Sequence, residues 1–149
     1  MEKVIFSSDE ITNSIKDTLA AGGIFPLVVT GTSMQPFLKN GEDVVWIRAC
    51  KPSDIKKGAI LLFERVDNSL ILHRVNAILP DGKIMMNGDA HKWREKISVG
   101  QVIAVVNEIE KNGKKTSCSS LWYRFRVFVW QLLRPIRHYI MRIFKLFRR

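Results

Sequence analysis

The sequence contains few cysteines and no pattern of metal ligands. Its 149 residues include two cysteines, Cys50 and Cys118, and neither belongs to a Cys-x-x-Cys pair. No cluster of cysteine and histidine has the spacing of a zinc site, and two thiols do not make a disulfide framework. The sequence therefore predicts reduced thiols, no metal site and no cofactor.

The N-terminal part lacks a long hydrophobic run. Residues 1–19 include six charged side chains, those of Glu2, Lys3, Asp9, Glu10, Lys16 and Asp17. The apolar run over residues 20–29 is too short to cross a bilayer, and Pro26 interrupts it. These features predict neither a signal peptide nor an N-terminal membrane span, so we expect the protein on the cytoplasmic face.

The C-terminal part lacks acidic residues. From residue 121 to the end there is no Asp or Glu, and there are eight cations: Arg124, Arg126, Arg134, Arg137, Arg142, Lys145, Arg148 and Arg149. They carry eight of the ten excess positive charges, which leaves residues 1–120 nearly neutral. A nucleic-acid-binding domain carries its positive charge on a folded face, so we do not expect a nucleic acid as partner.

Short strand-like runs separated by turn residues fill the central part of the chain. A helix is expected from Ser8 or Asp9 to about Ala21, where two glycines end it. Strands are expected over residues 24–29, 43–48, 59–64, 70–79, 83–86 and 101–110. Closely spaced strands with little helix predict a mainly β fold, a compact antiparallel β-domain over residues 1–110.

A polar segment and an amphipathic segment follow this domain. Residues 111–120 lack apolar anchors, which is typical of a linker. Residues 121–149 have helical periodicity, and Pro135 is expected to kink or split the helix. One face is apolar: Leu121, Trp122, Phe125, Phe128, Val129, Leu132, Leu133, Ile136, Tyr139, Ile140, Ile143, Leu146 and Phe147. The opposite face is basic, and Val127, Trp130 and Met141 interrupt it.

A basic amphipathic helix with aromatic residues suits the surface of an anionic membrane. The cations are spread too evenly for a segment that crosses the bilayer, because arginine is costly at its centre. We therefore expect residues 121–149 to bind a membrane surface peripherally. The alternative is that the apolar face packs on the β-domain or on a second copy of the chain.

A serine on a tight turn is the first candidate for chemistry. Ser33 follows the apolar run and lies between Gly31 and Pro36. Gly31 allows the main chain to turn sharply, and N–H groups of such a loop can face a developing oxyanion. A serine hydroxyl needs a neighbouring base before it becomes a nucleophile, so the rest of the sequence must supply one. The alternative is an ordinary turn.

His73 lies in an apolar strand and is the candidate base. By alternation it shares a face with Ile71 and Val75, whereas Arg74 points the other way and is expected to form a surface salt bridge. Imidazole titrates near neutrality, which suits a general base. The alternative is a histidine that only fills the core.

Asp89 follows Gly88 in a turn after a predicted strand. Its carboxylate can accept a hydrogen bond from the imidazole nitrogen that does not face the serine, which fixes the tautomer of the base. The alternative is a turn residue that bonds its own backbone.

Taken in order, these segments resemble a known family. Ser33-Met34-Gln35-Pro36, His73-Arg74-Val75 and Gly88-Asp89 resemble the signal peptidase I family of serine peptidases, in the endoplasmic-reticulum-type variant that has a histidine where bacterial enzymes have a lysine. The resemblance covers about residues 28–106. It implies a β fold of the signal peptidase and LexA type, with Ser33 as nucleophile, His73 as base and Asp89 as orienting acid.

The resemblance also implies that the loop around the serine contacts the oxyanion or the substrate, through Gly31, Thr32 and Met34. Several positions depart from the family pattern, among them Thr32, which lies where the family has Gly, and Ala59, which follows Gly58 where the family has Asp. Gly31 lies where many signal peptidases have a hydroxyl residue, an arrangement more similar to LexA-type repressors, and Ala90 lies where the family often has Asn.

The expected function is a serine endopeptidase that cleaves a precursor or leader peptide near a membrane. The first alternative is a weakly active or inactive peptidase-like module that binds peptides and is tethered to a membrane. The second is a LexA-like regulator that cleaves itself. No DNA-binding domain is evident for such a regulator, although the bond between Ala21 and Gly22 offers a cleavage site.

Overall fold

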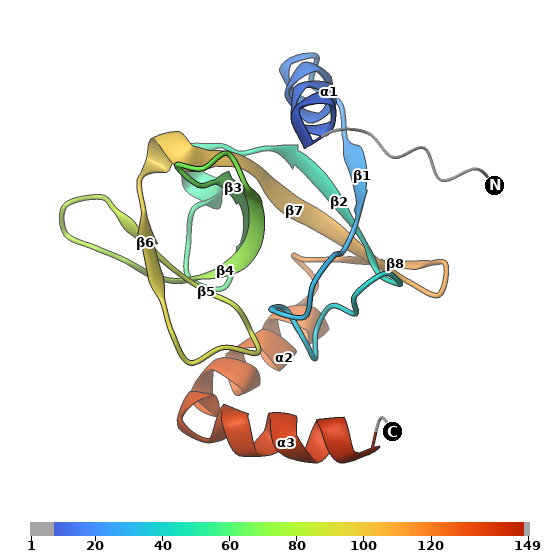
Figure 1. Ribbon diagram of the computed structural model, residues 1–149, viewed down its shortest axis with the longest axis vertical. Coiled ribbons are helices and arrows are strands. Elements are labelled where there is room, and N and C mark those ends of the chain that lie inside the picture. Colours follow the sequence, from blue (N-terminus) through green and yellow to red (C-terminus); the bar gives the residue numbers. More distant parts are fainter. Residues whose placement is uncertain (1–7, 148–149) are drawn as a thin grey trace.

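The protein is described from a computed structural model, and the structure describes residues 8–147 (Figure 1). Helix α1 (Ser8–Ala20) lies at one end of a β-sheet domain, and helices α2 (Leu121–Leu132) and α3 (Arg137–Phe147) lie at the opposite end. The strands are β1 (Phe25–Val28), β2 (Val44–Ala49), β3 (Ile60–Glu64), β4 (Leu70–Ile78), β5 (Ile84–Asn87), β6 (Glu95–Ile97), β7 (Val102–Lys111) and β8 (Lys114–Ser117). Short 3₁₀ turns cover Pro52–Asp54, Val99–Gln101 and Arg134–Ile136.

The strands of the described residues form one antiparallel sheet in the order β1-β2-β7-β3-β4-β5-β6, and β8 pairs with β7 outside this order. Strand β3 is buried on both faces. Its residues Ile60 and Leu62 belong to one apolar cluster, and Leu61 and Phe63 belong to a second. Because side chains alternate along a strand, β3 separates two cores. The predicted mainly β, antiparallel domain and its N-terminal helix are confirmed.

The segment expected to be a linker is partly a strand. Asn112 and Gly113 have positive φ, of 52° and 79°, so the chain reverses tightly and β8 pairs with the end of β7. This hairpin is held by main-chain pairing and by the Lys115 ammonium 3.8 Å from the centre of the Trp46 ring, so it needs no apolar anchor. The prediction of a linker over residues 111–120 is therefore wrong for Lys114–Ser117.

The C-terminal segment folds as two helices that pack against the β-domain. The predicted break at Pro135 is confirmed, since α2 ends at Leu132 and α3 begins at Arg137. The packed face carries Tyr123, Val127, Trp130 and Met141, all in the larger core cluster. Three of these are the residues that interrupt the basic face, so the helices dock through the face opposite to the predicted apolar one. No helix within residues 8–147 is long and apolar enough to cross a membrane.

A buried ion pair joins the sheet to these helices. The guanidinium of Arg74 donates to both carboxylate oxygens of Asp89, from Nε at 2.8 Å and Nη2 at 2.7 Å. It also donates to the carbonyl of Gly58 and to the hydroxyl of Tyr123 on α2. Arg74 is 1% exposed and Asp89 0% exposed. The expectation of a surface salt bridge at Arg74 is therefore wrong, because α2 covers this face of β4.

Arginine remains charged in this setting. Burial opposes the charge of Arg74, but the charge of Asp89 and the hydrogen bonds that Arg74 donates to Asp89 and Tyr123 outweigh it and raise the pKa of Arg74 above its usual value. Burial raises the pKa of the Tyr123 hydroxyl to about 12, so this group remains neutral as it accepts the bond. The pair is bidentate and fully hydrogen-bonded, which is the geometry that offsets the cost of burying two charges.

Asp89→Asn should lower the free energy of unfolding by about 3–5 kcal/mol, because it leaves a buried guanidinium without its counter-charge. The exposed pair of Lys16 and Glu64, 3.4 Å apart, provides the control. Lys16→Ala should cost only about 0–1 kcal/mol. Urea denaturation of both variants measures the difference, and equal losses would contradict the importance assigned to the buried pair.

Candidate active site

The loop between β1 and β2 carries Ser33, and several contacts hold it in place. Gly31 has a φ of +81°, which only glycine adopts without strain, and its N–H donates to Asn40 Oδ1 at 2.9 Å. Further along, the N–H of Leu38 donates to the carbonyl of Met34 at 2.9 Å. Both of these side chains are buried. The loop is thus held by a hydrogen bond before the half-buried Ser33 and by buried side chains after it.

Phe37 ties the same loop to the buried ion pair. Its ring lies 4.9 Å from the Arg74 guanidinium carbon, and it meets the Trp130 ring of α2 edge to face at 6.1 Å. A cation over an aromatic ring is attracted to it, most strongly where water is excluded. The serine loop is therefore positioned by β4 and by the C-terminal helices together.

Ser33 and His73 both approach Gly88 closely. The N–H of Ala90 donates to the carbonyl of Ser33 at 2.9 Å, which joins the serine loop to the turn after β5. A Cβ atom at Gly88 would lie 2.8 Å from the Ser33 carbonyl oxygen and 3.2 Å from His73 Nε2. Only glycine leaves room for this approach. The Ser33 carbonyl and His73 Nε2 thus both lie close to the turn that follows β5.

The Ser33 hydroxyl does not donate a hydrogen bond to His73. Within residues 8–147 the structure has no hydrogen bond between the Ser33 hydroxyl and His73. In that part of the chain the main-chain N–H of Ser33 also has no partner, so it can donate to an oxyanion. Catalytic hydrogen bonds are often long without substrate and shorten when the substrate binds.

His73 is 2% exposed and surrounded by rings. The rings of Phe63, His91 and Trp93 meet it edge to face at 6.0, 6.0 and 5.6 Å. Burial lowers the pKa of His73 to about 4; the carboxylate of Glu95 opposes this shift, and His91 and Arg65 add to it. The imidazole is therefore neutral at pH 7, the form that accepts a proton, although a low pKa makes it a weak base.

The carboxylate that faces His73 belongs to Glu95 of β6. His73 Nδ1 has no hydrogen bond within the described residues, and it lies 3.6 Å from Glu95 Oε1. Arg65 holds this carboxylate with two bonds, at 3.0 and 2.7 Å. Nε2 of His73 thus lies near the turn at Gly88, and Nδ1 faces the carboxylate of Glu95. This is the arrangement that a general base needs.

Asp89 has a different position from the one expected. Both of its carboxylate oxygens accept bonds from Arg74, and its main-chain carbonyl accepts one from Trp130 Nε1 at 3.0 Å. The expectation that Asp89 orients His73 is therefore corrected. Alternation along β4 sends Arg74 to the side of Asp89, whereas His73 faces Glu95 on the other side of the strand.

The sequence did not identify Glu95. Strand β6 has three residues and pairs with β5, so that Glu95 lies opposite Met86. A strand of this length among charged residues has no recognisable alternation, because the periodic signal needs four residues or more.

The other loop residues differ in what they can contribute. The N–H of Gly31 already donates to Asn40, so it cannot also serve an oxyanion. Thr32 is exposed beside Ser33 and can contact a substrate, and its carbonyl accepts a bond from Gln35. The Met34 side chain is 2% exposed and lies in the core, where it supports the loop.

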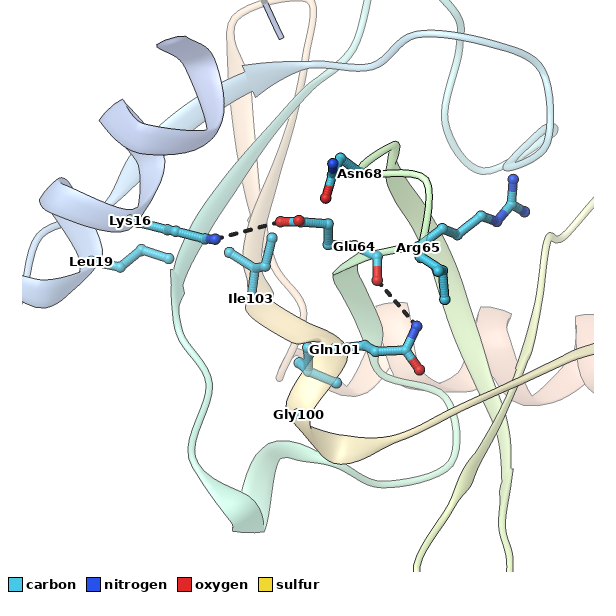
Figure 2. A pocket seen from close by; sticks show the side chains of 10 residues that line it. Lys16, Leu19, Glu64, Arg65, Asn68, Gly100, Gln101 and Ile103 are labelled. Atoms are coloured by element: carbon cyan, nitrogen blue, oxygen red, sulfur yellow. Dashed lines mark hydrogen bonds and ion pairs between the residues drawn. The ribbon is translucent and has the colours of Figure 1, made fainter. Parts of the chain in front are cut away.

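Two cavities lie away from this site. One of about 510 Å³ lies between α1 and the ends of β3 and β7, and Figure 2 shows Glu64 directed toward Lys16 there, with the neighbouring Arg65 directed the opposite way. The other, of about 540 Å³, lies beside α2 and includes Lys56 and Phe128 in its lining. Neither is lined by Ser33 or His73.

Neither thiol competes with Ser33 as a nucleophile. Burial raises the pKa of Cys118 to about 11, and burial also raises the pKa of Cys50. Both therefore remain protonated at neutral pH, and the thiolate is the reactive form. Among residues 8–147, no group of three or more His, Cys, Asp or Glu side chains is placed to hold a metal ion.

Comparison with known proteins does not assign the chain to a family. No protein-family model matches it, and no curated protein does. The structure itself describes an antiparallel β protein in which the loop that carries Ser33 lies near the buried imidazole of His73, and the carboxylate of Glu95 faces that imidazole.

Stability should depend on pH through His73. Its pKa is about 6.5 in the unfolded chain and about 4 in the fold, so the unfolded chain takes up the proton first as the pH falls. The stabilisation is complete above pH 6.5 and is lost progressively toward pH 4. His73→Gln should therefore show a smaller decrease in the free energy of unfolding than wild type between pH 7 and 5, measured with urea. Parallel pH profiles would contradict the burial of a neutral imidazole.

Proposed function

We propose that this protein is a serine endopeptidase of the signal peptidase type. The proposal is supported by the crowding at Gly88, where a Cβ atom would lie 2.8 Å from the Ser33 carbonyl oxygen and 3.2 Å from His73 Nε2, and by the 3.6 Å separation of His73 Nδ1 from Glu95 Oε1. A nucleophile, a neutral base and a carboxylate behind the base are the three parts of a serine hydrolase site, and such sites are recognised by geometry.

The chemistry follows from these positions. The Ser33 hydroxyl attacks the carbonyl carbon of a peptide bond, and its proton passes to His73 Nε2. The carboxylate of Glu95 stabilises the imidazolium that forms, and the free N–H of Ser33 donates to the oxyanion. His73 then returns the proton to the leaving amine, and the peptide bond breaks. Water, activated by the same imidazole, releases the acyl group from Ser33.

The substrate we propose is an extended peptide segment, such as a precursor or leader peptide. Strand β1 is at the edge of the sheet and pairs only with β2 among the described strands, and its chain leads directly into the serine loop. An extended peptide can add to such an edge through main-chain hydrogen bonds. This would bring a peptide bond of the substrate alongside Ser33.

Ser33→Ala and His73→Gln should each abolish the reaction of the folded protein with a fluorophosphonate probe, because one lacks the nucleophile and the other lacks the base. Intact-mass spectrometry measures the labelling. Ser119→Ala, a change at a serine in the turn before α2, is the matched control and should label as wild type does. Equal labelling of Ser33→Ala and wild type would refute the mechanism.

Glu95→Gln should slow labelling by about tenfold or more, because the imidazolium loses its stabilising carboxylate. Since Glu95 raises the pKa of His73, the variant should also move the acid limb of the rate profile below the wild-type position near pH 4. Glu64→Gln is the control, because Glu64 faces Lys16 and α1 (Figure 2). A purely structural role for Glu95 would leave the pH profile unmoved.

The second candidate is a peptide-binding module without catalysis. Two observations favour it: the missing hydrogen bond between the Ser33 hydroxyl and His73, and the low pKa of the imidazole. A folded protein that binds extended peptides and never reacts with the probe would establish this alternative. Self-cleavage between Ala21 and Gly22 has no such support, since that bond lies at the far end of β1 from the serine loop (Figure 1).

A further inference from the structure

Helices α2 and α3 each leave a row of large apolar side chains in solvent. We call these residues the apolar stripe: Leu121, Trp122, Phe125, Phe128 and Leu132 of α2, Ile136 of the turn, and Tyr139, Ile143, Leu146 and Phe147 of α3. Trp122 is 68% exposed and Phe128 60% exposed. Isolated apolar residues are common on protein surfaces, but a contiguous set of this size marks an interaction surface.

The direction of the stripe follows from the polar contacts of the other face. Trp130 donates to the carbonyl of Asp89, and the hydroxyl of Tyr123 accepts from Arg74. Arg137 donates to Asn87 Oδ1 at 2.8 Å and to the carbonyl of Trp130. These hydrogen bonds and the packed rings fix the inner face against the β-domain. Most of the apolar stripe is therefore on the side of the helices that faces away from the β-domain, whereas Phe128 and Leu132 also border the cavity between α2 and that domain.

The stripe is bordered by positive charge. Arg124 and Arg126 of α2 and Arg142 and Lys145 of α3 are exposed beside it. The sequence has no acidic residue after Glu110 to neutralise them. Trp122 and Phe125 stack with ring centres 6.0 Å apart, and such aromatic pairs suit an interface between water and hydrocarbon.

We propose that the apolar stripe binds the surface of an anionic lipid bilayer, with α2 and α3 lying in the plane of the interface. The apolar side chains enter the boundary between headgroups and acyl chains, and the flanking cations pair with anionic headgroups. A second copy of the chain is a poorer occupant. A symmetric dimer through this face would bring the same uncompensated cations together from both partners.

Membrane binding would also orient the candidate active site. Trp130 contacts both Phe37 of the serine loop and Asp89 of the turn beside His73. The helices that lie on the bilayer are thus joined directly to the loop that carries Ser33. This part of the inference rests on the proposed function, and it directs the peptidase to peptide segments close to a membrane surface.

Flotation of the full chain with vesicles tests the binding. Wild type should float with vesicles of phosphatidylcholine and phosphatidylglycerol in a 7:3 ratio, and binding to pure phosphatidylcholine should be at least about tenfold weaker. The double variant Phe125→Ser/Phe128→Ser should lose binding. Val66→Ser is the matched control, because Val66 is 98% exposed but lies outside the stripe, and it should bind as wild type does.

Charge reversal separates the electrostatic contribution to vesicle binding from the contribution of the apolar side chains. Arg124→Glu/Arg142→Glu should weaken binding to the anionic vesicles by about tenfold or more, whereas Lys83→Glu, at an exposed site between β4 and β5, should not. Equal binding to neutral and anionic vesicles, or none to either, would overturn the proposal. A dimer in lipid-free solution that Phe125→Ser/Phe128→Ser dissolves would overturn it in favour of a second copy.

Loss of vesicle binding can be distinguished from loss of reaction with the probe. Ser33→Ala should float with anionic vesicles as wild type does, since the stripe is remote from the hydroxyl. Vesicle binding without probe labelling would retain the membrane surface and refute the proposed function. Probe labelling without vesicle binding would retain the proposed function and refute the membrane surface.

Discussion

The buried pair of Arg74 and Asp89 is the interaction on which the rest of the structure depends. Two charges out of water are tolerated only if every donor and acceptor is matched, and the partners come from distant parts of the chain: Gly58, Tyr123 of α2, and the ring of Phe37. The pair can therefore form only when β4, the turn after β5, the serine loop and the C-terminal helices are all in place. It couples the fold of the β-domain to the docking of its tail.

The same strand serves the fold and the candidate site. Alternation along β4 directs Arg74 to the ion pair and His73 to the opposite face, toward Glu95 and the rings around it. Gly88 and Asp89 join the two faces, because the first makes room for Ser33 and His73 and the second closes the ion pair. A change that disturbs the pair would therefore displace His73 and Ser33 as well. The C-terminal helices are part of this arrangement through Trp130, and their outer face carries the exposed apolar stripe.

Much of the fold was predictable from local patterns. Alternating apolar residues indicated most of the strands, and the double glycine ended α1 where expected. The two missed strands lack this signal, since β6 has three residues and β8 is polar and held by main-chain pairing. In the candidate site, Ser33, His73 and Gly88 could be singled out from the sequence because a serine on a tight turn, a histidine within an apolar strand and a tight glycine turn are each local features. Glu95 was missed, because a carboxylate in a short charged strand looks like any surface acid.

The sequence by itself determined the antiparallel β architecture, the alternation that separates His73 from Arg74, and the amphipathic character of residues 121–147. These are consequences of bonded geometry and of periods of two or about 3.6 residues, which a chain carries before it folds. Only the tertiary structure decided which carboxylate meets which cation, and which face of the tail packs inward. Both depend on where distant elements bury charge and hydrogen-bonding groups. For this reason Asp89 pairs with Arg74, Glu95 faces His73, and the most apolar face of the tail is outside.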